Sequence, residues 1–331
     1  MDTVSLVIET ENLKGGAGHG DEVASLERLL THLRGQSFGL ERLRELVVTH
    51  EGMNEQSVMR LEKAAGRRIL FVEIPKDAGY YGGKDLGFDR TTGDVVVFGD
   101  ADCWPAPNWL SAITAPFESE AVQVVAGRTA YREGVLGEAL TTIDFLYFDS
   151  PLGDGCTRNF YANNVAFRRE VFGKFRYGEQ RGFYRGTCQV LGTRLLEAGI
   201  AVQYVHEALT THRLPDTFAE YARLRMLRGG DLVTLSPFIA RTALPKPAQP
   251  VAKVPGLMPV AVLAGRLLFS VLAGARERKP FVKQAAVTAV TVAASGMDAI
   301  GAAAKSAGLL RGVEREVLSY HSNRDGLRSA A

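Results

Sequence analysis

The sequence predicts an α/β protein, with a doubly wound, mostly parallel sheet followed by a C-terminal helical appendage. Two observations predict the sheet. Apolar runs typical of strands alternate with segments of helical spacing, and these runs are nearly continuous, as in parallel sheets that helices cover on both faces. A third observation, a pair of alanine- and valine-rich apolar segments near the C-terminus, predicts the appendage.

The expected elements follow one another in the order that such a sheet requires. Strands are expected at Val4–Ile8, Glu45–Thr49, Ile69–Val72, Asp94–Phe98 and Ala201–Val205, and helices at Asp21–Leu33, Glu55–Ala65 and Gly82–Thr91. The first helix is indicated by leucines that recur at helical spacing, from Leu26 to Leu33. In such sheets ligands bind beyond the carboxyl ends of the strands, so residues that follow a strand are the first candidates for a site.

A proline-rich stretch divides the chain. Six prolines fall between Pro237 and Pro259, which predicts a linker or an extended wrap. The predicted organisation is a sheet domain at residues 1–236, a linker at 237–259 and a helical segment at 260–331. The helical segment is predicted from two apolar stretches, Leu257–Ala275, which begins just inside the linker, and Ala285–Ala304.

Composition and charge exclude some classes of protein. The 331 residues are 46% apolar, which suits a buried core, and 39 basic against 37 acidic residues leave a net charge of +2. That balance gives no sign of a nucleic-acid partner, which usually requires a concentrated basic stripe. The three cysteines, Cys103, Cys156 and Cys188, are too few and too scattered for a disulfide framework. With no leader-like segment at the start, we expect a cytoplasmic protein.

The most informative stretch is Phe98–Pro105, which contains Asp100-Ala101-Asp102. Two carboxylates after a buried strand are costly unless a cation compensates them. A hard divalent ion such as Mg²⁺ takes one or two carboxylates together with phosphate oxygens, so the motif predicts a metal-bridged diphosphate. The alternative is a solvated turn that happens to hold two aspartates.

Several other residues are candidates by position. Lys84 could meet a diphosphate as a point charge, and Thr10 and Glu11, just past the first strand, could contact a base or ribose. His212 could complete the coordination of Mn²⁺. Arg228, with Arg223 and Arg225, could contact the diphosphate. Each has a plainer alternative, because most lysines and arginines are solvated and a lone histidine is more often structural.

The chain resembles family 2 glycosyltransferases with the nucleotide-sugar-binding (GT-A) fold. The resemblance rests on motifs in family order over about Val4 to Gly230. These are the first strand at Val4–Asn12, the helix Gly79–Gly87 with Thr92–Asp94, the Asp-x-Asp motif and the segment Tyr161–Phe172.

The resemblance implies a donor, a cofactor and roles for residues. It implies sugar transfer from a nucleoside-diphosphate sugar, UDP- or GDP-linked, with Mg²⁺ or Mn²⁺ as cofactor. By position, Asp100 would face the nucleoside or ribose, and Asp102 would hold the metal. Asn163, Asn164 and Arg185 would lie on the acceptor side.

The family pattern breaks at the catalytic base. Many inverting members carry Gly-Glu-Asp before a helix that ends like Arg194–Gly199, but this chain has Gly186-Thr187-Cys188 there. Another acid could replace the base, with Asp154 and Glu179 the nearest in sequence. The acceptor could instead need little deprotonation, since base catalysis is typically worth about 10²–10⁴-fold. A third alternative is a subunit that binds sugar nucleotides without transferring the sugar.

The C-terminal segments raise the question of a membrane. Arg266 lies near the middle of the first segment, and a basic stretch, 276–279, separates the two. Two spanning helices would place that basic stretch on the far side, against the positive-inside tendency. Peripheral contact through residues 257–304, at the inner face of the membrane, fits better, with a soluble helical subdomain as the alternative. Through the family resemblance, the acceptor could be lipid-linked, or it could be a small molecule such as a natural product.

Two further classes of enzyme are rivals. The glycines of 15–20 do not have the Gly-x-Gly-x-x-Gly spacing of a dinucleotide-binding oxidoreductase, so that signal is weak. Lys14 with these glycines could wrap a triphosphate, as in a nucleotidyltransferase on a similar sheet, which would release pyrophosphate.

Overall fold

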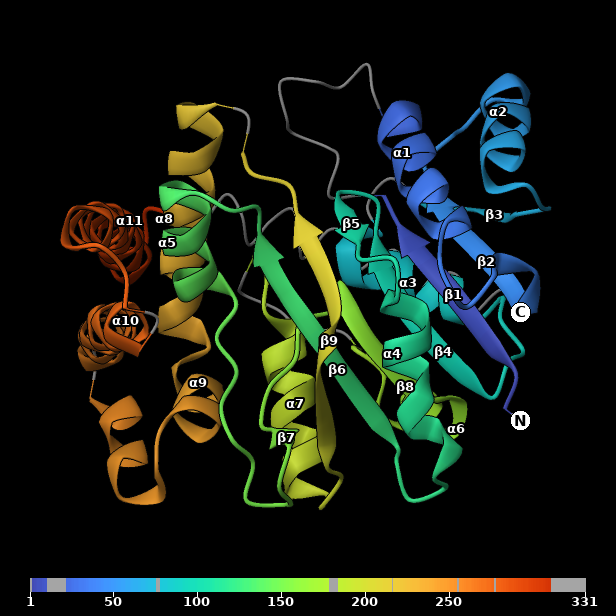
Figure 1. Ribbon diagram of the computed structural model, residues 1–331. Coiled ribbons are helices and arrows are strands. Elements are labelled where there is room, and N and C mark those ends of the chain that lie inside the picture. Colours follow the sequence, from blue (N-terminus) through green and yellow to red (C-terminus); the bar gives the residue numbers. More distant parts are fainter. Residues whose placement is uncertain are drawn as a thin grey trace. The chain divides into compact units, whose positions relative to one another are not determined.

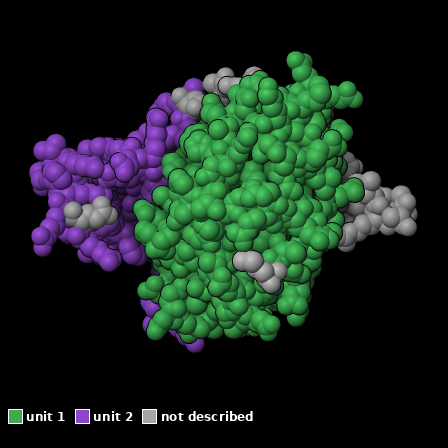
Figure 2. Space-filling model, turned by 45° about the vertical axis from the view of Figure 1, so that its right-hand side comes forward, with its two compact units in different colours: residues 1–129, 147–178, 191–213 green, residues 130–146, 179–190, 214–331 purple. Residues whose placement is uncertain are grey.

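The computed structural model describes most of the chain and divides it into two compact units. The described residues are 2–10, 22–75, 78–178, 184–215, 217–254, 256–276 and 278–310. Unit 1 takes residues 1–129, 147–178 and 191–213, and unit 2 takes 130–146, 179–190 and 214–331 (Figure 2). The boundary therefore differs from the predicted break at residue 236, because the helix before that residue groups with the C-terminal helices.

Within the described residues the sheet has nine strands, which Figure 1 labels. They are β1 (Val4–Glu9), β2 (Leu43–His50), β3 (Leu70–Glu73), β4 (Val95–Asp100), β5 (Cys103–Pro105), β6 (Val124–Tyr131), β7 (Cys156–Thr157), β8 (Asn164–Arg168) and β9 (Val202–His212). Their order is β3-β2-β1-β4-β8-β6-β9-β5, and β7 also pairs with β9. The pairs β2–β3, β1–β2 and β1–β4 are parallel, whereas β8 runs antiparallel to both β4 and β6. The predicted α/β fold is confirmed, and its parallel order ends at β8.

Helices cover both faces of this sheet (Figure 1). Unit 1 contains α1 (Glu22–Arg34), α2 (Glu55–Ala65), α3 (Gly79–Phe88), α4 (Trp109–Thr114), α6 (Arg169–Phe175) and most of α7 (Thr187–Glu197). Local sequence sets their ends. In α2, for example, the Asn54 side chain accepts the Ser57 N–H at 2.9 Å, and Gly66 ends the helix in the left-handed conformation.

The first strand shows how the two faces differ. Leu6 and Ile8 pack with leucines of α1 and with Trp109 of α4 in one hydrophobic core. The opposite face of β1 meets α3, where a Cβ at Gly87 would lie 2.5 Å from Cγ1 of Val7. Glycine therefore lets α3 approach the sheet closely, and this brings the side chains of α3 to the end of β4.

The strand β9 is longer than the sequence predicts. It was expected to end at Val205, with His212 in the loop beyond, but it continues to His212. The reason is pairing that the local sequence does not reveal. Cys103 pairs with His212 and Pro105 with Thr210 across the short strand β5. The pairing provides hydrogen-bond partners for backbone groups of Thr210–His212, a polar segment that resembles a turn in the sequence.

Unit 2 is mostly helical. It contains α5 (Val135–Asp144), α8 (Phe218–Thr234), α9 (Ser236–Ala243), α10 (Leu257–Arg276) and α11 (Phe281–Ser306). The predicted linker at 237–259 is thus largely helical, because α9 and a 3-10 segment, Lys246–Lys253, occupy it. Pro237 and Pro247 stand in the first turns of these two elements, where the missing N–H of proline costs nothing.

Buried ion pairs hold these helices together. Arg225 of α8 contacts Asp144 of α5 at 2.7 Å and Asp298 of α11 at 2.8 Å. Arg266 of α10 also pairs with Asp298, and Arg228 contacts Asp144 at 2.6 Å. Although burial raises the pKa of Asp144, the guanidinium groups of Arg225 and Arg228 together hold that pKa well below its usual range. The four helices are therefore tied by charges that have little access to water.

Close backbone contact supports the same packing. A Cβ at Gly229 of α8 would lie 2.0 Å from the carbonyl oxygen of Asp298, and one at Gly301 of α11 would lie 2.0 Å from that of Met226. Glycines at both positions allow α8 and α11 to approach each other closely, which positions Asp298 for Arg225.

Breaking this network should be costly. Asp298→Ala would leave Arg225 and Arg266 buried without one of their carboxylates, and loss of one partner of a buried pair costs about 3–5 kcal/mol. We therefore expect Asp298→Ala to lower the free energy of unfolding, measured by urea denaturation, by about 3–5 kcal/mol. The matched control is Arg60→Ala, which breaks the exposed pair of Arg60 with Glu27 and should change stability little. Equal effects of the two substitutions would contradict the role given to the network.

A second buried carboxylate in unit 2, Asp231 of α8, holds the segment that leads into α7. Its oxygens accept the N–H groups of Tyr184 at 2.6 Å and of Arg185 at 2.8 Å. Burial raises the pKa of Asp231 to about 7, although these two N–H groups act to lower it. Asp231 therefore loses a proton near neutral pH while it positions the residues just before Gly186.

The raised pKa of Asp231 predicts a pH dependence. A carboxyl that binds its proton more tightly when folded stabilises the protein fully below its ordinary pKa of 3.8. This stabilisation is lost as pH rises to about 7. The shift of about three pKa units corresponds to roughly 4 kcal/mol. We expect the free energy of unfolding of Asp231→Asn to lack this fall between about pH 4 and 7, while Asp154→Asn, which changes an exposed carboxyl, keeps it. Identical pH profiles for wild type and Asp231→Asn would contradict the assignment.

Candidate metal and donor site

The first carboxylate of the Asp-x-Asp motif lies at the end of β4. Asp100 is the last residue of that strand and stands opposite Glu9 of β1 in the parallel register. Two side chains one turn apart on α3 bind its two oxygens: Lys84 Nζ lies 2.5 Å from Oδ1, and the Tyr80 hydroxyl donates to Oδ2 at 2.8 Å. The Lys84 ammonium also donates to the Gly99 carbonyl at 3.1 Å. Asp100 is therefore anchored to α3 through both oxygens.

This arrangement limits what Asp100 and Lys84 can contact. Their side chains are 1% and 0% exposed. Burial, and then the nearby Asp102 carboxylate, raise the pKa of Asp100, although the Lys84 ammonium acts in the opposite direction. In this geometry Lys84 has no exposed position from which to meet a diphosphate, so its predicted donor contact gains no support. The same holds for a direct ribose contact by Asp100.

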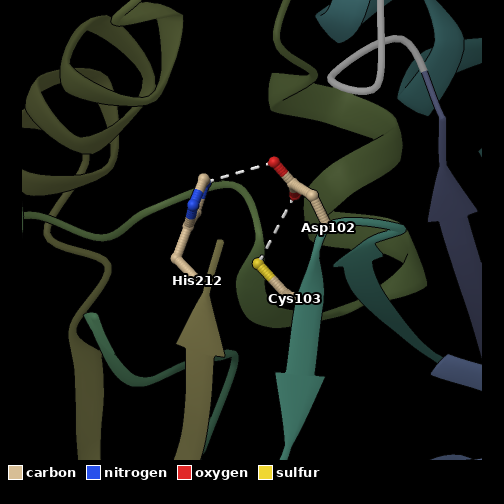
Figure 3. Close-up of side chains that lie close together, drawn as sticks. All are labelled: Asp102, Cys103 and His212. Carbon is tan, nitrogen blue, oxygen red and sulfur yellow. Dashed lines mark hydrogen bonds and ion pairs between the residues drawn. The ribbon is translucent and has the colours of Figure 1, made fainter. Parts of the chain in front are cut away.

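The second carboxylate belongs to a different cluster. Figure 3 shows Asp102, Cys103 and His212 with their side chains directed toward one another. The His212 Nε2 lies 3.6 Å from Asp102 Oδ2, and the Cys103 thiol donates to Asp102 Oδ1 at 3.7 Å. One potential ligand atom from each of the three lies within 4.8 Å of the others. The pairing of β5 with β9 brings these residues together.

The donor set can be tested against the predicted metal. A carboxylate and an imidazole are suitable ligands for Mn²⁺, and a carboxylate for Mg²⁺. Burial raises the pKa of the Cys103 thiol well above its ordinary value, and the charge of Asp102 raises it further. Mg²⁺ and Mn²⁺ favour oxygen and nitrogen ligands over the soft sulfur of cysteine. Asp102 and His212 fit the metal, and Cys103 lies beside them.

The two predicted acceptor-side asparagines differ in their roles. The Asn164 amide accepts the Trp109 indole N–H at 2.7 Å and donates to the carbonyls of Arg128 and Ala208, at 2.8 and 2.9 Å. Asn164 is fully buried, so it connects β8 to its neighbours rather than to a substrate. Asn163 donates to Cys103 Sγ at 3.5 Å, so it lies next to the group formed by Asp102, Cys103 and His212.

The other residues predicted to contact the donor or the acceptor have partners elsewhere or lie outside the described residues. The Thr10 hydroxyl is buried and donates to the Thr49 carbonyl at 2.9 Å. In unit 2, Arg228 pairs with Asp144, and the guanidinium of Arg185 lies 5.2 Å from the ring centroid of Tyr184. Glu11 and Glu179 lie outside the described residues, as do Lys14 and the glycines that follow it.

Asp154 lies far along the sheet from the candidate metal ligands Asp102 and His212. It is exposed in the turn before β7, where the Gly155 carbonyl accepts the Tyr204 N–H at 2.8 Å. Tyr204 and His212 are eight residues apart on β9, or about 26 Å at about 3.3 Å per residue. The expectation that Asp154 replaces the missing base at that site therefore gains no support from this geometry.

Sequence reasoning missed two residues of the site region, Tyr80 and Cys103, and one buried residue of unit 2, Asp231. Tyr80 could have been found, because it stands four residues before Lys84 on the same helix face. Cys103 was interpreted only as a reduced thiol, and its proximity to His212 depends on strand pairing. Asp231 gave no signal, because its contacts to Tyr184 and Arg185 join segments distant in sequence.

Comparison with known proteins adds to this geometry. Residues 21–184, about half of the chain, match the family described as Glycosyl transferase family 2. No curated protein matches the chain in sequence.

Solved structures share the fold at low identity. A mannosyltransferase from Pyrobaculum calidifontis, in complex with GDP-Man and Mn²⁺, is 16% identical with a TM-score of 0.60, covering 91% of this chain and 87% of that chain. The glucosyl-3-phosphoglycerate synthase from Mycobacterium tuberculosis, in complex with Mn²⁺, UDP-Glc and phosphoglyceric acid, is 19% identical with a TM-score of 0.46, covering 74% of this chain and 81% of that chain. At these identities the likeness concerns the fold alone. With the family match over residues 21–184, the chain is a glycosyltransferase and belongs to glycosyl transferase family 2.

Proposed function

We propose that this glycosyltransferase transfers a sugar from a UDP- or GDP-linked donor, with Mn²⁺ or Mg²⁺ held by Asp102 and His212. The observation that carries the proposal is the convergence of these two side chains, Asp102 from the turn before β5 and His212 from the end of β9, beside a buried carboxylate. The solved mannosyltransferase that shares the fold was captured with GDP-Man and Mn²⁺, which supports the same class of donor and metal here.

In the proposed reaction the acceptor oxygen bonds to the anomeric carbon as the bond from that carbon to the diphosphate oxygen breaks. The nucleoside diphosphate leaves, and the acceptor proton passes to a base. When bound, the metal supplies positive charge against the diphosphate. Asp102 and His212 position it, while the contacts of Asp100 with Lys84 and Tyr80 fix the turn from which Asp102 extends. Asn163, which donates to Cys103 Sγ, is the proposed acceptor-side asparagine.

The proposed acceptor is a lipid-linked or small-molecule hydroxyl compound, and the proposed location is the cytoplasm at the inner face of the membrane. Cys103, Cys156 and Cys188 are free thiols, which suits a reducing compartment. Helices α10 and α11 are long and apolar enough to cross a membrane, a weak indication that supports contact with one.

Binding of donor should depend on metal and on Asp102 and His212. UDP, GDP and their sugars are titrated by calorimetry. We expect wild type to bind either the uridine or the guanosine compounds with Mn²⁺, and to bind them far more weakly without it. Substitution of a residue that only hydrogen-bonds to a metal ligand typically costs about 10–100-fold in metal affinity. Loss of a ligand itself, in Asp102→Ala or His212→Ala, should therefore cost at least that much.

Two control variants sharpen this titration. Cys103→Ser should keep the metal-dependent binding, because Mn²⁺ and Mg²⁺ favour oxygen and nitrogen ligands over sulfur. Glu207→Gln, which changes an exposed residue of β9, should also bind like wild type. Metal-independent binding, or unchanged binding by Asp102→Ala, would contradict the proposed site. Donor binding without any sugar transfer would instead indicate a non-catalytic subunit.

The position of Asp154 gives a separate test of the reaction. Because it lies about 26 Å along β9 from His212, Asp154→Asn should release nucleoside diphosphate from the donor at the wild-type rate. Release is measured with a coupled assay over a range of donor concentrations. A loss of tenfold or more in kcat would show that this carboxylate acts in the reaction after all.

A further inference from the structure

The two C-terminal helices have their polar side chains inside and their apolar side chains outside. In α10 the polar residues Arg266 and Ser270 are both buried. Between Leu257 and Ala275, the exposed positions of the same helix are all apolar, and the large ones are Leu257, Val260, Leu268, Phe269, Val271 and Leu272. A surface helix of a soluble protein shows the opposite pattern.

The neighbouring helix repeats this arrangement. Thr291, Ser295 and Asp298 are buried in α11. Its most exposed large side chains are apolar and include Phe281 at 85%, Val282 at 79% and Ile300 at 60% exposure. Lys283, whose side chain is 42% exposed, pairs with Glu138 of α5. Two adjacent helices with the same inversion form one continuous apolar surface, larger than the scattered apolar residues that soluble proteins normally expose.

Both helices lie flat on the rest of unit 2. Figure 1 shows α10 and α11 nearly end-on beside α8, which is seen lengthwise, so the pair lies across α8. The buried Asp298 connects all three helices, through Arg225 of α8 and Arg266 of α10. The ion pairs thus fix the polar faces inward against α8 and leave the apolar faces outward.

Exposed cations lie at the edge of this surface. Arg276 and Arg278 are exposed at the turn between the helices, and Lys253 is exposed shortly before α10. Among the described residues of 256–276 and 278–310, Asp298 is the only acidic one, and it is buried. Glu277, between the two arginines in sequence, lies outside the described residues. An apolar face edged by exposed cations is complementary to the surface of an anionic bilayer.

We infer that the outer faces of α10 and α11 dock this protein on an anionic lipid surface, with both helices lying in the plane of the interface. The inference deepens the proposed function, on which it rests for the cytoplasmic location, by naming the docking face and the charge of the lipid. Docking itself requires neither donor nor metal.

Flotation with vesicles tests the proposal on the full chain. We expect wild type to float with vesicles of phosphatidylcholine and phosphatidylglycerol, and less with phosphatidylcholine alone. Leu268→Gln/Leu272→Gln should reduce binding to both vesicles at least about tenfold, since burial of each leucine is worth about 1.5 kcal/mol or more. Arg276→Gln/Arg278→Gln should weaken binding only to the anionic vesicles, by about fivefold per residue.

The controls separate docking from folding and from the donor site. Met59→Gln/Leu152→Gln changes exposed apolar residues of unit 1 and should float like wild type. Asp102→Ala should lose donor binding and still float, whereas Leu268→Gln/Leu272→Gln should still bind donor. Failure of wild type to float, or flotation of the leucine variant like wild type, would overturn the proposal. The proposal would also be overturned if light scattering showed a dimer for wild type and a monomer for the leucine variant. A second copy of the chain would then cover this face.

Discussion

The donor end of the sheet depends on one buried ion pair, between Lys84 and Asp100. A carboxylate with 1% exposure at the end of a strand costs several kcal/mol unless it is compensated, and Lys84 and Tyr80 compensate it from a single helix face. The pair can form because Gly87 lets α3 lie close to β1. With Asp100 fixed, the tight turn that follows presents Asp102 at the carboxyl end of the parallel strands.

The second half of the site comes from the part of the sheet where the parallel order ends. After β4 the chain adds antiparallel strands, and β9 returns beside β5 so that His212 stands opposite Cys103. The proposed ligand pair, separated by more than a hundred residues in sequence, is thereby held by β9 and by the turn that leads into β5. The rigidity of paired strands suits a metal site, whose ligands must keep their geometry.

How much of this could be predicted from sequence depended on whether the signal was local. Continuous apolar runs predicted the strands β1 to β4, the bounds expected for α2 are those observed, and the Asp-x-Asp motif predicted the candidate site. The register between β5 and β9 could not be predicted, so His212 was expected in a loop. The burial of Lys84 was missed because a lysine on an amphipathic helix is usually solvated. Proline content suggested a linker where α9 forms, because prolines in a first turn are compatible with a helix.

The most direct test of the central claim is the position of the metal. Crystals of the full chain grown with Mn²⁺ and the nucleoside diphosphate that binds should be measured at a wavelength where manganese scatters anomalously. The account predicts an anomalous difference peak in contact with Asp102 and His212 and with the diphosphate, and none next to Lys84. A peak elsewhere, or a diphosphate bound without one, would contradict the assignment of the donor site.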